Sequence, residues 1–302
     1  MNLTFNIRES LDKGGTYYQT DFERGIAQEA GLPMPTWFQA KHELLPLPKP
    51  PSFELFENLL FNVSPATGAR LTLRTKTTRL ECDCAKANRR LCYELCAGLP
   101  KTLSVMALVV GDIRILIAFS LRILEMLQMA VDLAATRVRK NGKDHNRLTQ
   151  HLIALLLAHI TSRAGDPQAH YHIPFPNLTW DPVEQCFKAL EFSYILEKKE
   201  LLARWASAQL MHDLIGLGYD IELTDNRYEI AGVSRELIER FSKQLSNIQK
   251  AVTAKEAATK VPLSAAGRKF ASLSLRIPKV SQTRHVSCGP RAWETNHLCA
   301  EP

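Results

Sequence analysis

Three histidines near the middle of the chain have the spacing of a metal site. His159 is followed eleven residues later by His170, and His172 comes two residues after that. Residues two apart in a strand face the same side, so His170 and His172 present two imidazoles together, and His159 on a neighbouring strand can supply a third. Three neutral imidazoles can hold a divalent metal with open positions, as catalytic metals require. The alternative is three unrelated surface histidines among the nine in the chain.

A tyrosine pair near the N-terminus is a second candidate for chemistry. The phenol of Tyr17 or Tyr18 could attack phosphorus and form a covalent phosphotyrosine. Aromatic pairs at such places are more often core residues, so the pair alone does not separate the two interpretations.

Four cysteines in two close pairs could be read as a zinc site. Cys82 and Cys84 form one pair, and Cys92 and Cys96 form the other. Neither pair has the two-residue gap typical of zinc sites, although Cys92 and Cys96 share one face of a strand. We interpret all four as thiols that share no metal.

A basic run follows a turn-forming segment, residues 64–68. Its members are Arg70, Arg74, Lys76 and Arg79, followed by Arg89 and Arg90. Such a run is either the solvated edge of a sheet or a surface that binds a phosphate backbone.

Composition favours a globular protein with a polyanionic partner. The chain has 302 residues, 45% of them hydrophobic, and a net charge of +7. This charge suggests nucleic acid before membrane as the partner. Residues 105–127 form the longest apolar stretch, but four charged residues interrupt it, which excludes a membrane span. With no signal peptide and seven cysteines best read as reduced thiols, we expect a cytoplasmic protein.

Hydrophobic periodicity predicts how these residues are positioned. Strands are expected at residues 2–7, 70–79, 91–95, 151–160, 170–179 and from 218 onward. Helices are expected at residues 9–18, 53–61, 101–140, 190–217 and 234–248. The basic residues 137–140 would suit a helix C-terminus. The proline-rich residues 31–52 predict an extended connection or lid, and residues 276–302 a loosely packed tail.

The order of these motifs resembles the relaxase domain of the MobF (TrwC-like) conjugative relaxases, which are of the HUH endonuclease type. The resemblance begins with Tyr17-Tyr18 and Ser64-Pro-Ala-Thr-Gly-Ala-Arg70. It continues through Leu99-Pro-Lys-Thr-Leu-Ser104 and His159-Ile-Thr-Ser-Arg163 to His170-Tyr-His172. The histidine spacing is the most specific part, and the matching segments extend over most of the chain.

This resemblance implies an α+β fold in which a central antiparallel sheet is flanked by helices. The implied reaction is metal-dependent nicking of single-stranded origin-of-transfer DNA by transesterification, which leaves a 5′-phosphotyrosyl link. Tyr17 would be the nucleophile and Tyr18 the adjacent candidate, while Glu94 would orient a metal-bound histidine or accept the tyrosine proton.

The implied metal and DNA sites use further residues. His159, His170 and His172 would bind Mg²⁺ or Mn²⁺, with Zn²⁺ as the alternative. Arg163 would pair with a phosphate, and Arg70, Arg74 and Lys76 would bind DNA. Accessory relaxosome proteins and a separate helicase are the further implied partners, and no membrane span is expected.

The resemblance also implies a domain division. Residues 1–260 would form the relaxase domain, with the proline-rich insert at 31–52, and residues 261–302 a basic tail. No Gly-x-x-x-x-Gly-Lys-Ser/Thr loop occurs in the sequence, so no helicase domain is expected.

Several positions depart from the family pattern. Glu94 replaces an aspartate, Phe119 replaces a histidine, and the second tyrosine pair is missing. Pro174 and Pro176 should end the strand or create a bulge after His172, because proline removes ladder donors.

These departures leave two alternatives open. One is a catalytically impaired DNA-binding relative of the relaxases that does not nick. The other is a metal-dependent hydrolase of another substrate that uses the histidines without a covalent tyrosine.

Overall fold

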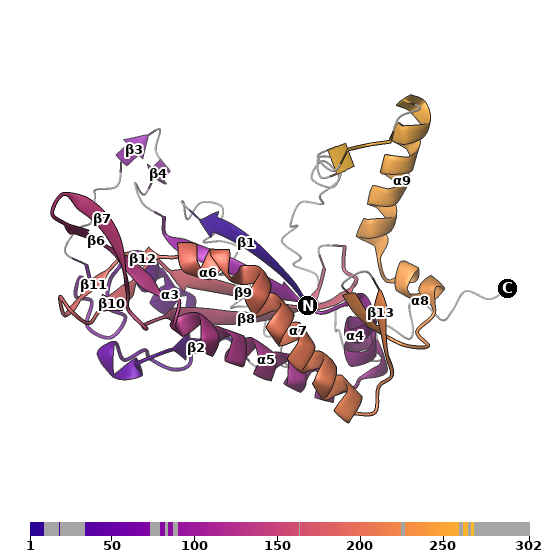
Figure 1. Ribbon diagram of the computed structural model, residues 1–302, viewed down its shortest axis with the longest axis horizontal. Coiled ribbons are helices and arrows are strands. Elements are labelled where there is room, and N and C mark those ends of the chain that lie inside the picture. Colours follow the sequence, from indigo (N-terminus) through magenta and orange to yellow (C-terminus); the bar gives the residue numbers. More distant parts are fainter. Residues whose placement is uncertain are drawn as a thin grey trace.

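A five-stranded antiparallel sheet forms the centre of the protein (Figure 1). The computed structural model describes residues 1–8, 18, 34–72, 79–81, 84–86, 90–162, 164–224, 227–259, 262–264 and 267–268. The strands lie in the order β1 (Asn2–Arg8), β5 (Cys92–Gly98), β9 (Pro167–Pro176), β8 (Ile153–Thr161) and β2 (Thr36–Gln39). Every neighbouring pair is antiparallel.

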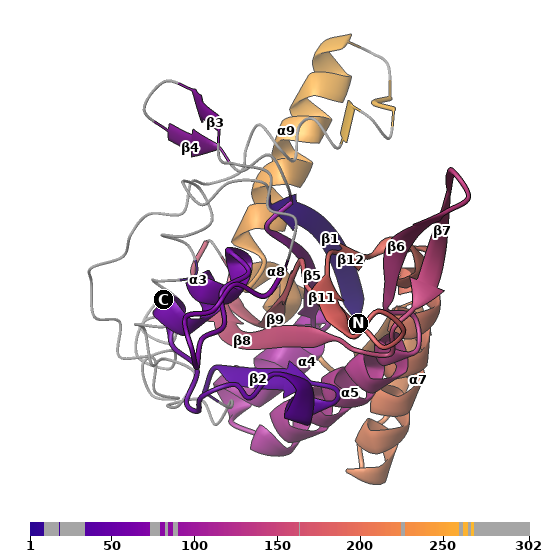
Figure 2. The same cartoon turned by 90° about the vertical axis from the view of Figure 1, so that its left-hand side faces the viewer.

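The two faces of this sheet are covered differently. Helices α5 (Ile113–Val131) and α7 (Lys199–Gly216) pack on one face, where Leu95, Tyr171 and Ile173 belong to the larger core. On the opposite face, α3 (Phe53–Leu60) packs with Trp37, Leu155 and Leu157 in a smaller core. Figure 2 shows the sheet between α3 on one side and α5 on the other. Alternation along each strand therefore directs one set of side chains into the larger core and the other set toward α3.

A short helical segment connects β5 to α5. Helix α4 (Lys101–Val105) continues into a π-helix at Met106–Val110. Gly111, with φ of 90°, ends this segment, because the left-handed region suits glycine. Asp112 then caps α5 by accepting a hydrogen bond from the backbone N–H of Arg114.

Smaller sheets and helices surround this body. One small sheet contains β12 (Leu190–Glu191), β6 (Ala135–Lys140) and β7 (Lys143–Leu148). The two-stranded sheets are β3–β4 (Arg79–Glu81, Cys84–Lys86), β10–β11 (Thr179–Asp181, Cys186–Lys188) and β13–β14 (Ile221–Thr224, Arg227–Ile230). The other helices of the described residues are η1 (His42–Leu44), α6 (Ser193–Glu197), α8 (Arg235–Arg240) and α9 (Lys243–Thr259), and α9 projects from the body (Figure 1).

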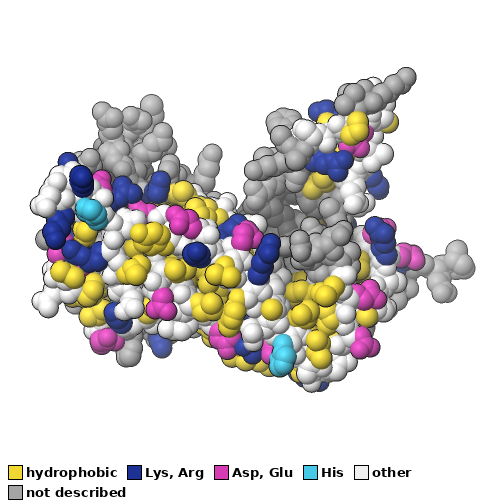
Figure 3. All heavy atoms as spheres, viewed as in Figure 1, with side chains coloured by type: hydrophobic (Ala, Val, Ile, Leu, Met, Phe, Trp, Pro, Cys, Tyr) yellow, Lys and Arg dark blue, Asp and Glu magenta, His cyan; other side chains and the backbone are white. Residues whose placement is uncertain are grey.

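Hydrophobic side chains gather on the surface over α5 and α7 (Figure 3). Ile117 and Leu121 of α5 are about half exposed, and Leu201 and Ile215 of α7 are also exposed. Among the described helices, none is both long and apolar enough to cross a membrane.

The predicted fold class is confirmed. The protein is α+β, with a central antiparallel sheet flanked by helices. The strands predicted at 2–7, 91–95, 151–160 and 170–179, and the helix predicted at 53–61, are present with shifts of a few residues. The helix predicted at 190–217 is divided at Lys198, and the one predicted at 234–248 is divided between α8 and α9.

The prediction of one helical region over residues 101–140 is wrong at its end. Helix α5 stops at Val131, and Ala135–Lys140 is strand β6, paired with β7. Asn141 and Gly142 both have positive φ, at 51° and 77°, which is the geometry of a tight hairpin turn. The basic residues at 137–140 therefore lie in a hairpin rather than at a helix C-terminus.

Of two predictions that relied on proline, the first is incomplete and the second is wrong. Residues 31–52 are not only a connection, because Thr36–Gln39, which contains no proline, forms strand β2 and pairs with β8. Strand β9 neither ends nor bulges after His172: Pro174 lies opposite Glu94, and Pro176 opposite Cys92. Pairing between β8 and β9 stops at His172, so β9 has one neighbour beyond it and proline is tolerated there.

Some predictions lie outside the described residues. These are the helix before Tyr18, most of the strand predicted at 70–79, and the tail at 276–302. The domain boundary at residue 260 stays a prediction.

Candidate active site

The register between β8 and β9 brings the three histidines together. His159 lies directly opposite His170, and His172 follows on the same face of β9. The ring centroids are 5.1 Å apart for His159 and His170, 4.8 Å for His159 and His172, and 5.1 Å for His170 and His172. The predicted constellation is therefore a real cluster, while its role in binding a metal stays a proposal.

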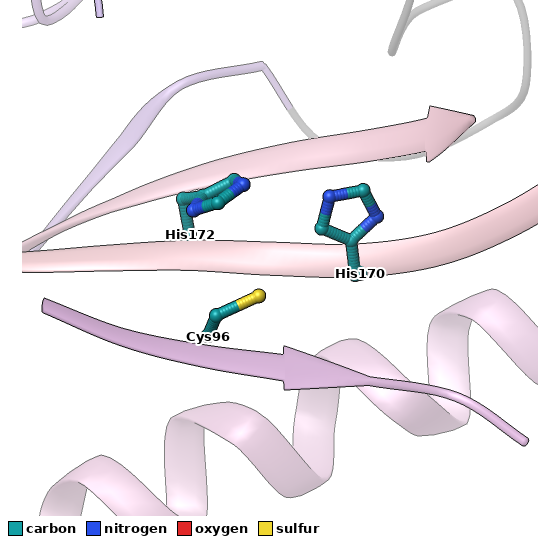
Figure 4. Close-up of side chains that lie close together, drawn as sticks. All are labelled: Cys96, His170 and His172. Carbon is teal, nitrogen blue, oxygen red and sulfur yellow. The ribbon is translucent and has the colours of Figure 1, made fainter. Parts of the chain in front are cut away.

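Strand β5 adds a thiol to this cluster. Cys96 lies opposite His172 on the neighbouring strand, so its side chain is on the histidine face. The Cys96 sulfur and one ring nitrogen from each of His170 and His172 lie within 4.8 Å of one another. Figure 4 shows the thiol reaching from β5 toward the two rings on β9.

Hydrogen bonds set the orientation of the two imidazoles on β9. The Nδ1 of His170 lies 2.9 Å from the backbone carbonyl of Gln168, which can only accept, so Nδ1 carries the proton. The Nδ1 of His172 lies 2.6 Å from Oε1 of Glu94 and donates to that carboxylate. A neutral ring with its proton on Nδ1 carries its lone pair on Nε2, the atom through which such a ring binds a metal.

Glu94 connects the histidines to the tyrosine pair. Its carboxylate is completely buried, and its Oε2 accepts a 2.8 Å hydrogen bond from Oη of Tyr18. The Tyr18 ring is 1% exposed and packs edge-on against Phe56, with the ring centroids 5.4 Å apart. Glu94 thus holds Tyr18 with one oxygen and His172 with the other.

A cleft of about 1130 Å³ opens beside the cluster. Cys96 and His170 line it together with Lys101, Asp166 and Arg204. Burial lowers the pKa of Lys101, and the opposing charges of Asp166 and Glu229 raise it in part. The histidine cluster is therefore reachable from a cleft with charged walls.

The other residues singled out in the sequence are placed only in part. Tyr17, Arg163, Arg74 and Lys76 lie outside the described residues. Arg70 is exposed and forms an isolated bridge with Val63. The spacing between Cys92 and Cys96 is not that of a zinc site, so Cys96 was not predicted as a site residue. Its position two residues after Glu94, on the same strand face, is the signal that could have found it.

Comparison with known proteins identifies the family. The family model described as TrwC relaxase matches residues 8–296. The chain belongs to the TrwC relaxase family. The MobF (TrwC-like) assignment made from the motifs is therefore confirmed.

Individual relatives of this TrwC-family chain agree with that assignment. It is 27% identical to the multifunctional conjugation protein TraI of Escherichia coli over 259 residues. This alignment covers 83% of this chain and 14% of TraI. The TraI of strain K12 is 28% identical over 169 residues, covering 53% of this chain and 10% of TraI. The chain thus spans a small part of the length of these curated relatives.

Solved structures of the conjugative relaxase TrwC share the fold. A copper-bound complex of TrwC with oriT DNA superposes with a TM-score of 0.80 at 24% identity, covering 97% of both chains. A metal-bound complex of TrwC with oriT DNA gives a TM-score of 0.78 at the same identity, covering 97% of this chain and 96% of TrwC. This TrwC-family chain therefore has the fold of the TrwC relaxase.

Proposed function

We propose that this chain is a conjugative relaxase domain that nicks single-stranded origin-of-transfer DNA by tyrosine transesterification. Family membership and the oriT DNA complexes of TrwC support the substrate class. The observation that carries the proposal is a pair of hydrogen bonds to buried Glu94, one from Tyr18 and one from His172. Through them the tyrosine pair is connected to a histidine cluster of the kind that binds metals. A cytoplasmic location, accessory relaxosome proteins and a separate helicase stay predictions.

In this proposal Tyr17 is the nucleophile. Its phenolic oxygen bonds to the scissile phosphorus, the bond between phosphorus and the 3′ oxygen breaks, and the 3′ oxygen leaves with a proton. The product is a 5′-phosphotyrosyl link. Tyr18 is the weaker candidate because its hydroxyl is buried and donates to Glu94, whereas a nucleophile must reach a DNA phosphate.

The histidine cluster fits a divalent metal. The Nδ1 atoms of His170 and His172 are held by hydrogen bonds in the orientation that gives each ring a lone pair on Nε2, and His159 lies beside both rings. A bound metal would polarise the phosphate and offset its developing negative charge. The contacts favour the orienting role for Glu94, because both of its oxygens accept hydrogen bonds, one from Tyr18 and one from His172.

The test is covalent capture of DNA. Purified protein is incubated with labelled single-stranded origin-of-transfer DNA from its own replicon and Mg²⁺, Mn²⁺ or Zn²⁺, then run on a denaturing gel. We expect an SDS-resistant adduct that requires the metal and disappears in Tyr17→Phe. Tyr194→Phe is the matched control, because Tyr194 lies on α6 outside the site.

Two results would overturn the proposal. If Tyr17→Phe still forms the adduct and Tyr18→Phe does not, the nucleophile is wrongly assigned. If the wild-type protein binds the DNA but forms no adduct with any of the metals, while a TrwC control does, the chain is not a nicking enzyme.

A further inference from the structure

We propose that Cys96 is a ligand of the metal site, so that a thiolate joins the imidazoles of His170 and His172. This inference rests on the metal site of the proposed function and adds a donor that the three-histidine reading does not contain. It predicts a site with a preference for thiophilic metals.

Strand register places the thiol where a ligand is needed. Cys96 is directly opposite His172, and Gly98, the next residue of β5 on that face, lies opposite His170. Gly98 has no side chain, and Glu94, two residues before Cys96, contacts Nδ1 of His172, so Cys96 is the residue of β5 whose side chain lies near the metal-binding side of both rings. Cys96 is half-buried and lines the cleft, which gives an ion a route to the sulfur.

The distances suit coordination after a small adjustment. The sulfur and the two ring nitrogens lie within 4.8 Å of one another, and tetrahedral coordination brings such atoms to about 3.5 Å. The difference of roughly 1 Å is within the reach of side-chain torsions in a half-buried site. Cys96 carries a thiol rather than a disulfide, and a thiol that loses its proton is the form of cysteine that binds metals.

The donor set determines which metals it selects. Thiolate and imidazole together favour Zn²⁺, Co²⁺ and copper, whereas Mg²⁺ and Mn²⁺ prefer oxygen ligands. On binding, the thiol proton is released to solvent and the sulfur forms the bond to the metal. Glu94 strengthens metal binding at the same site, because a histidine that donates Nδ1–H to a carboxylate is a better metal ligand through Nε2.

The test uses Co²⁺ as a spectroscopic probe on the full, reduced chain. A cobalt–thiolate bond gives a charge-transfer absorption in the near ultraviolet that cobalt–imidazole bonds do not. We expect this band in the wild-type protein, its loss in Cys96→Ser, and at least a tenfold weaker Co²⁺ affinity in that variant. Cys186→Ser is the control and should keep the band, since Cys186 lies on β11 outside the cluster.

A second measurement does not require a variant to fold. Iodoacetamide labelling of the wild-type chain, mapped by mass spectrometry, should alkylate Cys96 in the metal-free protein and spare it when Zn²⁺ is present. Labelling of Cys186 should be the same in both conditions.

The outcomes separate this inference from the proposed function. Co²⁺ binding without the charge-transfer band, or with a band that survives in Cys96→Ser, would overturn the role of Cys96 and leave an imidazole site standing. No Co²⁺ binding, with or without oriT DNA, would overturn the role of Cys96, while the metal-dependent adduct with oriT DNA decides the proposed function separately. Equal labelling of Cys96 with and without Zn²⁺ would also count against the role of Cys96.

Discussion

The phenolic hydroxyl of Tyr18 donates a 2.8 Å hydrogen bond to Oε2 of Glu94. The other oxygen of this buried carboxylate accepts a 2.6 Å hydrogen bond from Nδ1 of His172. A single side chain on β5 therefore connects the tyrosine pair near the N-terminus to the histidines of β9. The extra methylene of Glu94, relative to the aspartate of the family pattern, does not prevent either contact.

Replacing Glu94 with glutamine should weaken metal binding. The amide can accept from Tyr18 with its oxygen, but its NH₂ group then faces Nδ1 of His172 and forces that ring to carry its proton on Nε2. The lone pair is lost from the metal side, and we expect a 10- to 100-fold loss of affinity for Co²⁺ or Zn²⁺. Titration calorimetry measures it, with Glu191→Gln on β12 as the control. An unchanged metal affinity in Glu94→Gln would contradict the role of Glu94 in orienting His172.

Tyr18→Phe should destabilise the fold without abolishing the covalent adduct. The variant leaves Oε2 of Glu94 buried and without its donor, which costs about 1–3 kcal/mol. The free energy of unfolding in urea measures this, and the control Tyr194→Phe should stay within about 0.5 kcal/mol of wild type. Loss of the adduct in a folded Tyr18→Phe protein would contradict the assignment of Tyr17, rather than Tyr18, as the nucleophile.

Stability should fall in mild acid because of His151. Burial, with a smaller contribution from the charge of Lys41, lowers the pKa of this imidazole from 6.5 to about 4. Its Nδ1 accepts from the backbone N–H of Trp180, which requires the neutral ring. The unfolded chain binds a proton below pH 6.5 and the folded one only near pH 4, so this contribution is complete above pH 6.5 and is lost as the pH falls.

Between pH 7 and pH 5 the loss should be about 2 kcal/mol in the free energy of unfolding. His151→Asn keeps an acceptor near the position of Nδ1 but cannot titrate. We expect it to be less stable at pH 7 and to lose less than wild type between these pH values. Urea unfolding at both values tests this, and parallel pH profiles for the two proteins would refute it.

Phe119 is a core residue, and its truncation should be costly. It is completely buried on α5, and its ring centroid lies 5.4 Å from that of Tyr171. Phe119→Ala should lower the free energy of unfolding by about 3–5 kcal/mol through lost burial and the resulting cavity. Ile117→Ala on the exposed face of the same helix is the control, expected within about 0.5 kcal/mol of wild type. A small effect at Phe119 would contradict its place in the core.

Arg70 provides a test of the proposed DNA-binding surface. It is exposed on the segment that follows the turn at residues 64–68. If it neutralises one phosphate of single-stranded DNA, Arg70→Ala should reduce the slope of log affinity against log salt by about 0.7. Fluorescence anisotropy with labelled oriT DNA measures the slope. Arg139→Ala, at an exposed position of β6, should leave the slope unchanged, and equal slopes for wild type and Arg70→Ala would exclude this contact.

The sequence by itself determined the local features of this protein. The alternation of β1 is visible in the residues, as is the spacing that puts His170 and His172 on one face. The order of motifs was enough to identify the family. Local patterns were misleading where the same residues suit two structures. The basic residues of Ala135–Lys140 are typical of a helix C-terminus, but the Asn141-Gly142 turn that follows makes this segment the first strand of a hairpin.

Only the tertiary structure decided which side chains meet. Cys96 and His172 are 76 residues apart in sequence, and Tyr18 and Glu94 are also 76 apart. Their contacts depend on the register between strands and on packing against α3, which long-range pairing sets and no local pattern encodes. The tolerance of β9 for Pro174 has the same origin, because it depends on where the neighbouring strand β8 stops pairing.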